Sequence, residues 1–178
     1  MPNWCQNFVQ IKGQNLKALK ELIGDGTNLL SRFYPTPQAL VETTSPFNGT
    51  EEERAKLVKE YGSDDWYSWN CDHWGTKWDV EVEAPQFLDD QINLYFDSAW
   101  APPLQAMRKL STLFPDVTIR HSYLEVGMCF VGVAEISNGE VNDNYNEDPD
   151  SEEWKKMAAD EFGWEGWEYD DEEDDVSV

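Results

Sequence analysis

Residues 92–126 read "INLYFDSAWAPPLQAMRKLSTLFPDVTIRHSYLEV", and this stretch decides the fold. Apolar and polar residues alternate over 92–100, which predicts a half-buried β-strand. A helix is predicted over 101–115, because apolar residues recur at helical spacing between prolines that suit its first turn and its end. Residues 117–126 read as another strand. The stretch therefore forms a strand, helix, strand unit.

A matching unit is predicted upstream. "QNFVQIKG" at 6–13 has strand character, and "NLKALKELIGDG" at 15–26 predicts a helix with Asn15 as its N-cap and Gly24 as its stop. The alternation in "WGTKWDVEVE" predicts a second strand over 74–83. One face of that strand would carry Trp74, Thr76, Trp78, Val80 and Val82.

Two additions to these units are predicted. Residues 38–72 look like an insertion with a peripheral helix, opened by Thr50 with Glu53 at the capping-box spacing. Residues 127–136 form a further strand, and the Asn-Gly pair of "SNGE" at 137–140 favours a tight hairpin that returns through "VNDNY".

The order of these elements defines the expected fold class. It is α+β, with a ferredoxin-like (split β-α-β) antiparallel sheet, two packed helices, a helical insertion, an added hairpin and an acidic C-terminal tail. Helices would cover one face of the sheet and leave the other open. We expect a ferredoxin-like domain over 1–146, including the insertion, and an acidic aromatic helix and tail over 147–178.

Charge limits the kind of partner. Thirteen basic residues face 36 acidic ones, giving a net charge of −23, and 17 of the acids lie from Glu140 onward. Such a chain is unsuited to direct binding of phosphate backbones or of anionic membranes, because phosphate affinity comes from lysine and arginine. A protein partner with a basic groove or patch is expected instead.

Cysteine use and hydropathy indicate the compartment. The three cysteines are widely spaced, no signal peptide is evident, and no apolar run is long enough to span a membrane, which together predict free thiols in the cytoplasm. Cys71 and His73 lack a second ligand pair, so no metal is predicted. No cofactor motif is present, and the sequence does not indicate the oligomeric state.

Aromatic motifs are predicted to meet at one corner of the sheet. In a ferredoxin-like sheet the starts of the first two strands and the end of the third share one end. We therefore expect a wall formed by Trp4, Trp74, Trp78 and Trp100. This wall is either a pocket or peptide-binding platform, or part of the core that seals the sheet.

A carboxylate pair is predicted beside this corner. Asp79 and Asp97 would face each other on the open side with Lys77 next to them. Two close carboxylates raise one pKa and can act as acid and base or hold a metal, and the alternative is a charge-balanced solvated face.

The C-terminal segment has three interpretations. It is a solvated charge run, a docking peptide anchored by Trp164, Trp167 and Tyr169, or a nucleic-acid mimic that occupies a basic groove. Both functional interpretations predict binding that weakens as salt rises.

Four motifs also resemble a known family. They are "MPNWCQN" at 1–7, "DDWYSWNCDHWGTKWD" at 64–79, "FDSAWAPP" at 96–103 and "LEVGMCFVG" at 124–132. In order and spacing they resemble the YubB-like ferredoxin-like domain family of phages and conjugative plasmids, over roughly residues 1–140, with His73 in place of an expected Asn. The resemblance implies a ferredoxin-like fold and a mobile genetic element as source, and it implies no activity.

These observations lead to one expected function and one alternative. We expect a non-enzymatic phage or mobile-element protein that binds a host protein through an acidic, aromatic-rich surface and inhibits a defence or nucleic-acid-processing enzyme. The alternative is an enzyme or small-ligand binder that uses the tryptophan-lined corner around WGTKWD and FDSAW.

Overall fold

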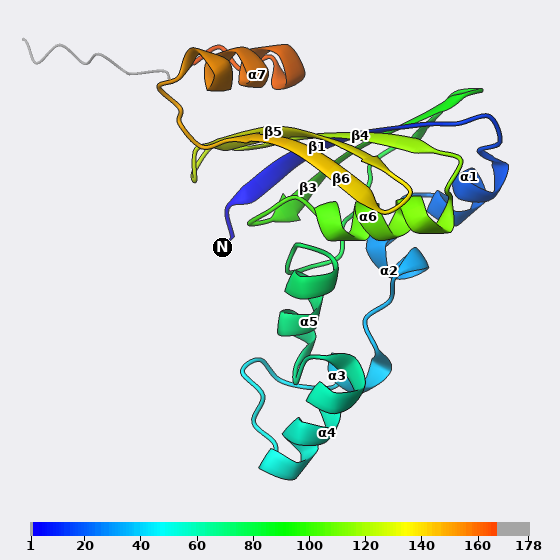
Figure 1. The fold of residues 1–178 in the computed structure, drawn as a ribbon, viewed down its shortest axis with the longest axis vertical. Coiled ribbons are helices and arrows are strands. Elements are labelled where there is room, and N and C mark those ends of the chain that lie inside the picture. The colour runs from blue at the N-terminus through cyan, green and yellow to red at the C-terminus, as the bar shows by residue number, and fades with distance from the viewer. Residues whose placement is uncertain (1, 167–178) are drawn as a thin grey trace, which may run out of the picture.

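The computed structural model describes residues 2–166 of the chain (Figure 1). A single antiparallel sheet has the strand order β2-β3-β1-β4-β5-β6. Its strands are β1 (Trp4–Lys12), β2 (Gln86–Phe87), β3 (Gln91–Ala99), β4 (Thr118–Glu125), β5 (Phe130–Ser137) and β6 (Glu140–Asn146). The first four strands have the ferredoxin-like order and the last two form the added hairpin, so the predicted fold class is confirmed.

Helices lie on both faces of the sheet and beyond its end. They are α1 (Lys17–Ile23), α2 (Leu29–Phe33), α3 (Gln38–Val41), α4 (Glu51–Tyr61), α5 (Trp66–His73), α6 (Leu104–Leu113) and α7 (Glu152–Phe162). Figure 1 shows α1 and α6 against one face, α7 over the opposite face, and α3, α4 and α5 projecting away from the sheet.

The main core lies between the sheet and the α1/α6 layer. Strands β1 and β3 contribute Val9, Ile11, Ile92 and Leu94, all fully buried. Helices α1 and α6 contribute residues at helical spacing, among them Leu19, Ile23, Met107 and Leu110. Burial of one face of each element accounts for the alternation and the helical period seen in the sequence.

The ends of these elements follow the sequence in most cases. Gly24 ends α1 with φ 56°, as predicted, whereas the N-cap is Leu16 without a side-chain hydrogen bond, so the prediction of Asn15 is wrong. In the β5–β6 hairpin, Asn138 and Gly139 take φ 46° and 82°, the left-handed pair that a tight primed turn requires.

The insertion is partly peripheral. Helix α4 has the predicted capping box between Thr50 and Glu53 and no buried residue. The sequence did not predict α5, which begins at Trp66 and is capped by Asp65, whose carboxylate accepts from the Ser68 amide. Through Trp69, which is 4% exposed, α5 joins the main core.

The predicted strand over residues 74–83 is wrong. Trp74 ends α5, and Gly75 turns the chain at φ 88°. The segment then pairs with the loop after α1, where the Val82 amide donates to the Gly26 carbonyl at 3.0 Å. The strand that pairs with β3 at this edge of the sheet is the short β2, which follows the segment. The alternation in sequence still has a cause, since Trp74, Thr76, Val80 and Val82 are buried.

Helix α7 covers part of the face that was expected to be open. Trp154 is fully buried and packs in a second hydrophobic cluster with Leu124, Val131 and Ala158. Its indole nitrogen donates to the Cys129 carbonyl at 2.9 Å. Residues before and after position 146 therefore share one cluster, and the β1/β3 side of this face stays uncovered.

Candidate binding cleft

A cleft of about 810 Å³ lies on the uncovered side of this face. Its floor is formed by β1 and β3, one wall is the segment 79–83, and the other wall is the end of α7. Five acidic side chains line it: Asp79, Glu81, Glu83, Asp97 and Glu161. Four aromatic side chains line it as well: Trp4, Phe8, Tyr95 and Phe162, whereas the ring of Phe96 points into the main core. We call this site the acidic cleft, and no lysine or arginine lines it in the described part of the chain.

The floor of the acidic cleft is an aromatic platform. Phe8 and Tyr95 lie directly opposite each other in the β1/β3 register, and their rings stack at 4.3 Å with planes 7° apart. Tyr95 is 49% exposed and Trp4, at the rim, is 51% exposed. Cross-strand pairing thus holds large rings flat on a surface that water can reach.

The acids of the cleft fall into two groups. Asp79 is occupied within the fold, because its carboxylate accepts from the Leu30 amide at 2.7 Å and the Ser31 amide at 3.0 Å. It therefore caps α2 and does not pair with Asp97 as the sequence suggested. The neighbour that acts on Asp97 is Glu83: partial desolvation first, and then the Glu83 charge, raise the pKa of Asp97.

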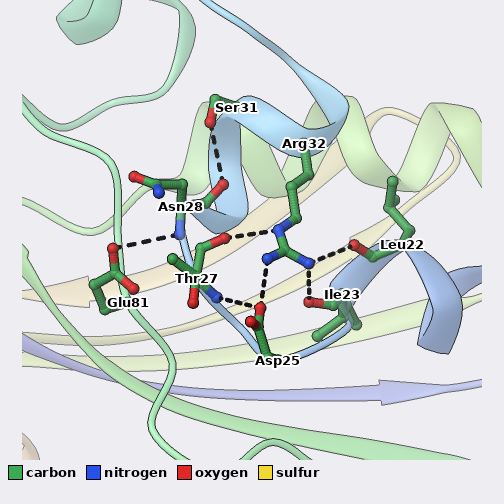
Figure 2. Close-up of polar contacts among 8 residues, drawn as sticks. All are labelled: Leu22, Ile23, Asp25, Thr27, Asn28, Ser31, Arg32 and Glu81. Atoms are coloured by element: carbon green, nitrogen blue, oxygen red, sulfur yellow. Dashed lines mark hydrogen bonds and ion pairs between the residues drawn. The ribbon is translucent and has the colours of Figure 1, made fainter.

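The segment 79–83 is held in place by the loop between α1 and α2. Leu29 donates to the Val80 carbonyl at 3.0 Å, and a Cβ at Gly26 (φ 87°) would collide with the Val82 carbonyl. Arg32 secures this loop from within, as Figure 2 shows. Its Nε donates to the Thr27 carbonyl at 2.6 Å, and its guanidinium also reaches the carbonyl oxygen that ends α1 and a carboxylate in the loop.

The wall made by α7 is tied to the sheet by an ion pair. Both guanidinium ends of Arg120 on β4 donate to Glu161, at 2.7 and 2.5 Å, and Ser122 donates to the same carboxylate at 2.7 Å. Hydrogen bonding from Arg120 is the main cause that lowers the pKa of Glu161. Because Asp79 and Glu161 are already paired, the charge available to a ligand comes mainly from Glu81, Glu83 and Asp97.

The structure brings some of the predicted corner together. The rings of Trp4 and Trp78 lie 6.2 Å apart, and Lys77 Nζ sits 4.6 Å from the Trp78 ring centroid. Trp74 is 4% exposed and its indole donates to the Tyr34 carbonyl at 2.7 Å, which makes it a core residue. Trp100 is 46% exposed beside the corner.

The predicted tail residues divide at the end of the described chain. Trp164 packs edge-on against Trp154, with centroids 4.8 Å apart, so it stabilises the docking of α7. Trp167 and Tyr169 lie outside the described residues.

Sequence reasoning missed six side chains of the cleft as site residues: Phe8, Glu81, Glu83, Tyr95, Glu161 and Phe162. One signal was present, because Phe8 lies between Gln6 and Gln10 on the polar side of an alternating strand. Together with the exposed rings of Tyr95 and Trp4, an aromatic side chain there forms a contiguous apolar patch, which indicates a binding surface. Glu161 and Phe162 gave no such signal, since their place depends on how α7 docks.

The described residues form neither a metal centre nor a membrane-spanning helix. Residues 2–166 contain no group of three or more histidine, cysteine or acidic side chains arranged to hold a metal ion. Within the same range, every helix is too short or too polar to cross a bilayer. The three cysteines are free thiols.

The fold and the site together define an α+β protein of the ferredoxin-like class with an acidic cleft on its sheet. The family described as "Ferredoxin-like domain in Api92-like protein" matches residues 73–174, more than half of the chain, and the chain belongs to this family. The match begins at residue 73, so it includes the motifs at 96–103 and 124–132 noted above and continues past residue 140.

A solved structure supports the same fold. The crystal structure of the protein api92 from Yersinia pseudotuberculosis superposes with a TM-score of 0.52 at 11% sequence identity, covering 83% of this chain and 98% of that one. At this identity the likeness concerns the fold alone. No curated protein matches the chain.

Proposed function

We propose that this chain is a non-enzymatic binding protein of a phage or another mobile element, and that its acidic cleft captures a basic segment of a host protein in the cytoplasm. The observation that carries the proposal is the lining of the cleft, which combines five carboxylates and four aromatic rings without a basic residue in the described part of the chain. The mobile-element source is supported by the sequence resemblance alone.

The chemistry of the cleft favours arginine or lysine side chains in an extended segment. An exposed ring such as Tyr95 offers its face to a cation, and Glu83 and Asp97 lie where they can accept from it. Ionisation of Asp97 is disfavoured in the free protein, so a bound cation would relieve repulsion with Glu83. The acids of the cleft that have no partner within the fold would therefore supply most of the free energy of binding a cation.

The acidic C-terminal sequence would extend this interaction. Residues 167–178 add seven acids and no base to the charge of the chain. A partner with a basic groove, such as a defence or nucleic-acid-processing enzyme, would be attracted over a long range and then blocked at the groove. The attraction falls as salt rises because the Debye length shortens.

Capture from a bacterial lysate tests the proposal. Four forms serve as bait: the full chain, a form ending at residue 166, the cleft variant Glu83→Gln/Asp97→Asn, and the control variant Glu51→Gln/Glu52→Gln on α4. The end point 166 is chosen because a cut at 146 would remove Trp154 and expose the second cluster. Both double variants remove two negative charges, so only a site-specific partner distinguishes them.

We expect one protein with a basic surface to be captured by the full chain and the α4 control at low salt, and lost by the cleft variant. Equal capture by the two double variants would refute the cleft as the binding site. Loss only on truncation to 166 would assign the interaction to the tail instead.

A small-ligand or catalytic role at the tryptophan-lined corner is the second candidate. The observation in its favour is the raised pKa of Asp97 beside Glu83, since such pairs occur at functional sites. A corner site would keep its ligand at high salt and after truncation, and would lose it on Asp97→Asn or Lys77→Ala.

A further inference from the structure

A second site lies on the other side of the sheet, between α5 and α6. It is a pocket of about 370 Å³, and the side chains that matter for its chemistry are Tyr34, Asp72, His73, Gln105, Arg108 and Lys109. Gln105, Arg108 and Lys109 follow one another at helical spacing on the outer stripe of α6, while Met107 and Leu110 face the core. The pocket is thus far from the acidic cleft in the fold, since α6 covers the opposite face of the sheet (Figure 1).

This pocket concentrates positive charge in a strongly acidic protein. Within residues 2–166, Arg108 has no carboxylate partner within 4.0 Å, whereas the other three arginines each do; Lys109 also has none, as is true of six other lysines. The chain has 36 acidic residues for 13 basic ones, so carboxylates that could pair with a basic side chain are abundant. Asp72 is the one acid that lines the pocket, and it cannot neutralise both cations.

The remaining groups in the pocket are polar atoms on rigid rings. His73 is fixed by stacking on Trp69 at 4.2 Å and by its Nδ1, which donates to the Trp69 carbonyl at 2.9 Å. Its Nε2 faces a ligand as an acceptor for a phosphate hydroxyl in the neutral ring and as a donor to a phosphate oxygen in the protonated ring. Tyr34 lies edge-on to His73, with centroids 5.7 Å apart, and burial raises the pKa of its hydroxyl, which therefore stays protonated. Lys109 Nζ lies 5.5 Å from the Tyr34 ring centroid.

We propose that this pocket binds a small phosphomonoester, with the phosphate between Arg108, Lys109 and His73 and the organic group against Tyr34. A guanidinium and an ammonium beside an imidazole suit a doubly charged phosphate better than a single carboxylate. The pocket exceeds the size of a free phosphate and falls in the range of small-molecule sites, about 300 to 1,000 Å³. This site is independent of the acidic cleft and of the function proposed for it.

The two histidines of the chain provide the test. His121 is fully buried in the sheet with its Nε2 at 2.9 Å from Asn7, so its imidazole signal serves as an internal reference. Phenyl phosphate and inorganic phosphate are titrated separately into the full chain, and the imidazole resonances are followed by NMR. We expect a saturable shift of His73 alone, with tighter binding of phenyl phosphate.

Variants distinguish phosphate binding at this specific pocket from attraction to any exposed basic side chain. Arg108→Gln and Lys109→Gln should each weaken phenyl phosphate about tenfold, because each removes a charged hydrogen bond. Lys59→Gln on α4, an exposed cation outside the pocket, should leave affinity unchanged. All three positions are surface positions, and circular dichroism verifies the fold of each variant.

Several results would overturn the proposal. These are the absence of a saturable His73 shift with either phosphate, equal weakening by Lys59→Gln and Arg108→Gln, or equal affinity for the two phosphates. Because no readout involves the acidic cleft, failure here leaves the proposed function untouched.

Discussion

Replacing Trp154 with alanine should release α7 from the sheet. The side chain is fully buried, and a tryptophan buries about 200 Å². At about 25 cal/mol per Å² this amounts to about 5 kcal/mol, and measured truncations of large buried side chains fall at about 3–5 kcal/mol. The variant also leaves the Cys129 carbonyl without its indole donor. We therefore expect α7 docking to weaken by about 4 kcal/mol.

Hydrogen exchange measures this loss locally. Amides of α7 should exchange faster by more than about two orders of magnitude, since about 1.4 kcal/mol corresponds to a factor of ten. Amides of β1 and β3 should stay protected, because their side chains belong to the separate main core. Trp100→Ala, which truncates a ring that is 46% exposed, is the matched control and should cost less than about 1 kcal/mol. Unchanged α7 exchange in the Trp154 variant would refute the packing argument.

Three more predictions concern stability. Gly132→Ala should lower the free energy of unfolding by about 2 kcal/mol in urea titration, because the new Cβ would collide with the buried Tyr123 hydroxyl, and a neutral result would show that the ring can move. Glu161 has a pKa held below its ordinary value of 4.5, so its stabilisation is present above that value and is lost as the pH falls through the folded pKa. Acid titration of α7 exchange should therefore show a step that Glu161→Gln removes, and persistence of the step would exclude the Arg120 pair as its cause. Asp97 has a raised pKa, so its stabilising contribution is present below the ordinary value of 3.8 and is lost as the pH rises through the folded pKa. Asp97→Asn should accordingly raise the thermal midpoint at neutral pH, and a lower midpoint would contradict the assigned desolvation.

The fold could be predicted because its determinants are local. Over residues 92–126 the two periods of the sequence correspond to the buried faces of β3 and α6. The same reasoning failed for residues 74–83, where Trp74 and Val80 alternate with exposed residues in a segment that lies on the core without joining the sheet. An alternating sequence pattern indicates which side chains face the core. It does not indicate which segment forms backbone hydrogen bonds with the alternating one.

The candidate site could be predicted only in part. The aromatic excess and the Trp4–Trp78 contact were accessible from the sequence and the expected topology. The Phe8–Tyr95 stack depends on strand register, and the wall containing Glu161 depends on a helix docking through contacts far apart in the sequence. Such contacts are fixed by tertiary packing, which local patterns do not specify.

The claim that the acidic cleft is the binding site is tested most directly by a titration with an arginine-rich peptide. Affinity at low salt is compared among the unmodified chain, Glu83→Gln/Asp97→Asn and the charge-matched Glu51→Gln/Glu52→Gln. We predict that the cleft variant loses at least about tenfold in affinity, while the α4 variant stays within about twofold. Equal losses in the two variants would show that the peptide responds to net charge alone, and would contradict the assignment of the cleft.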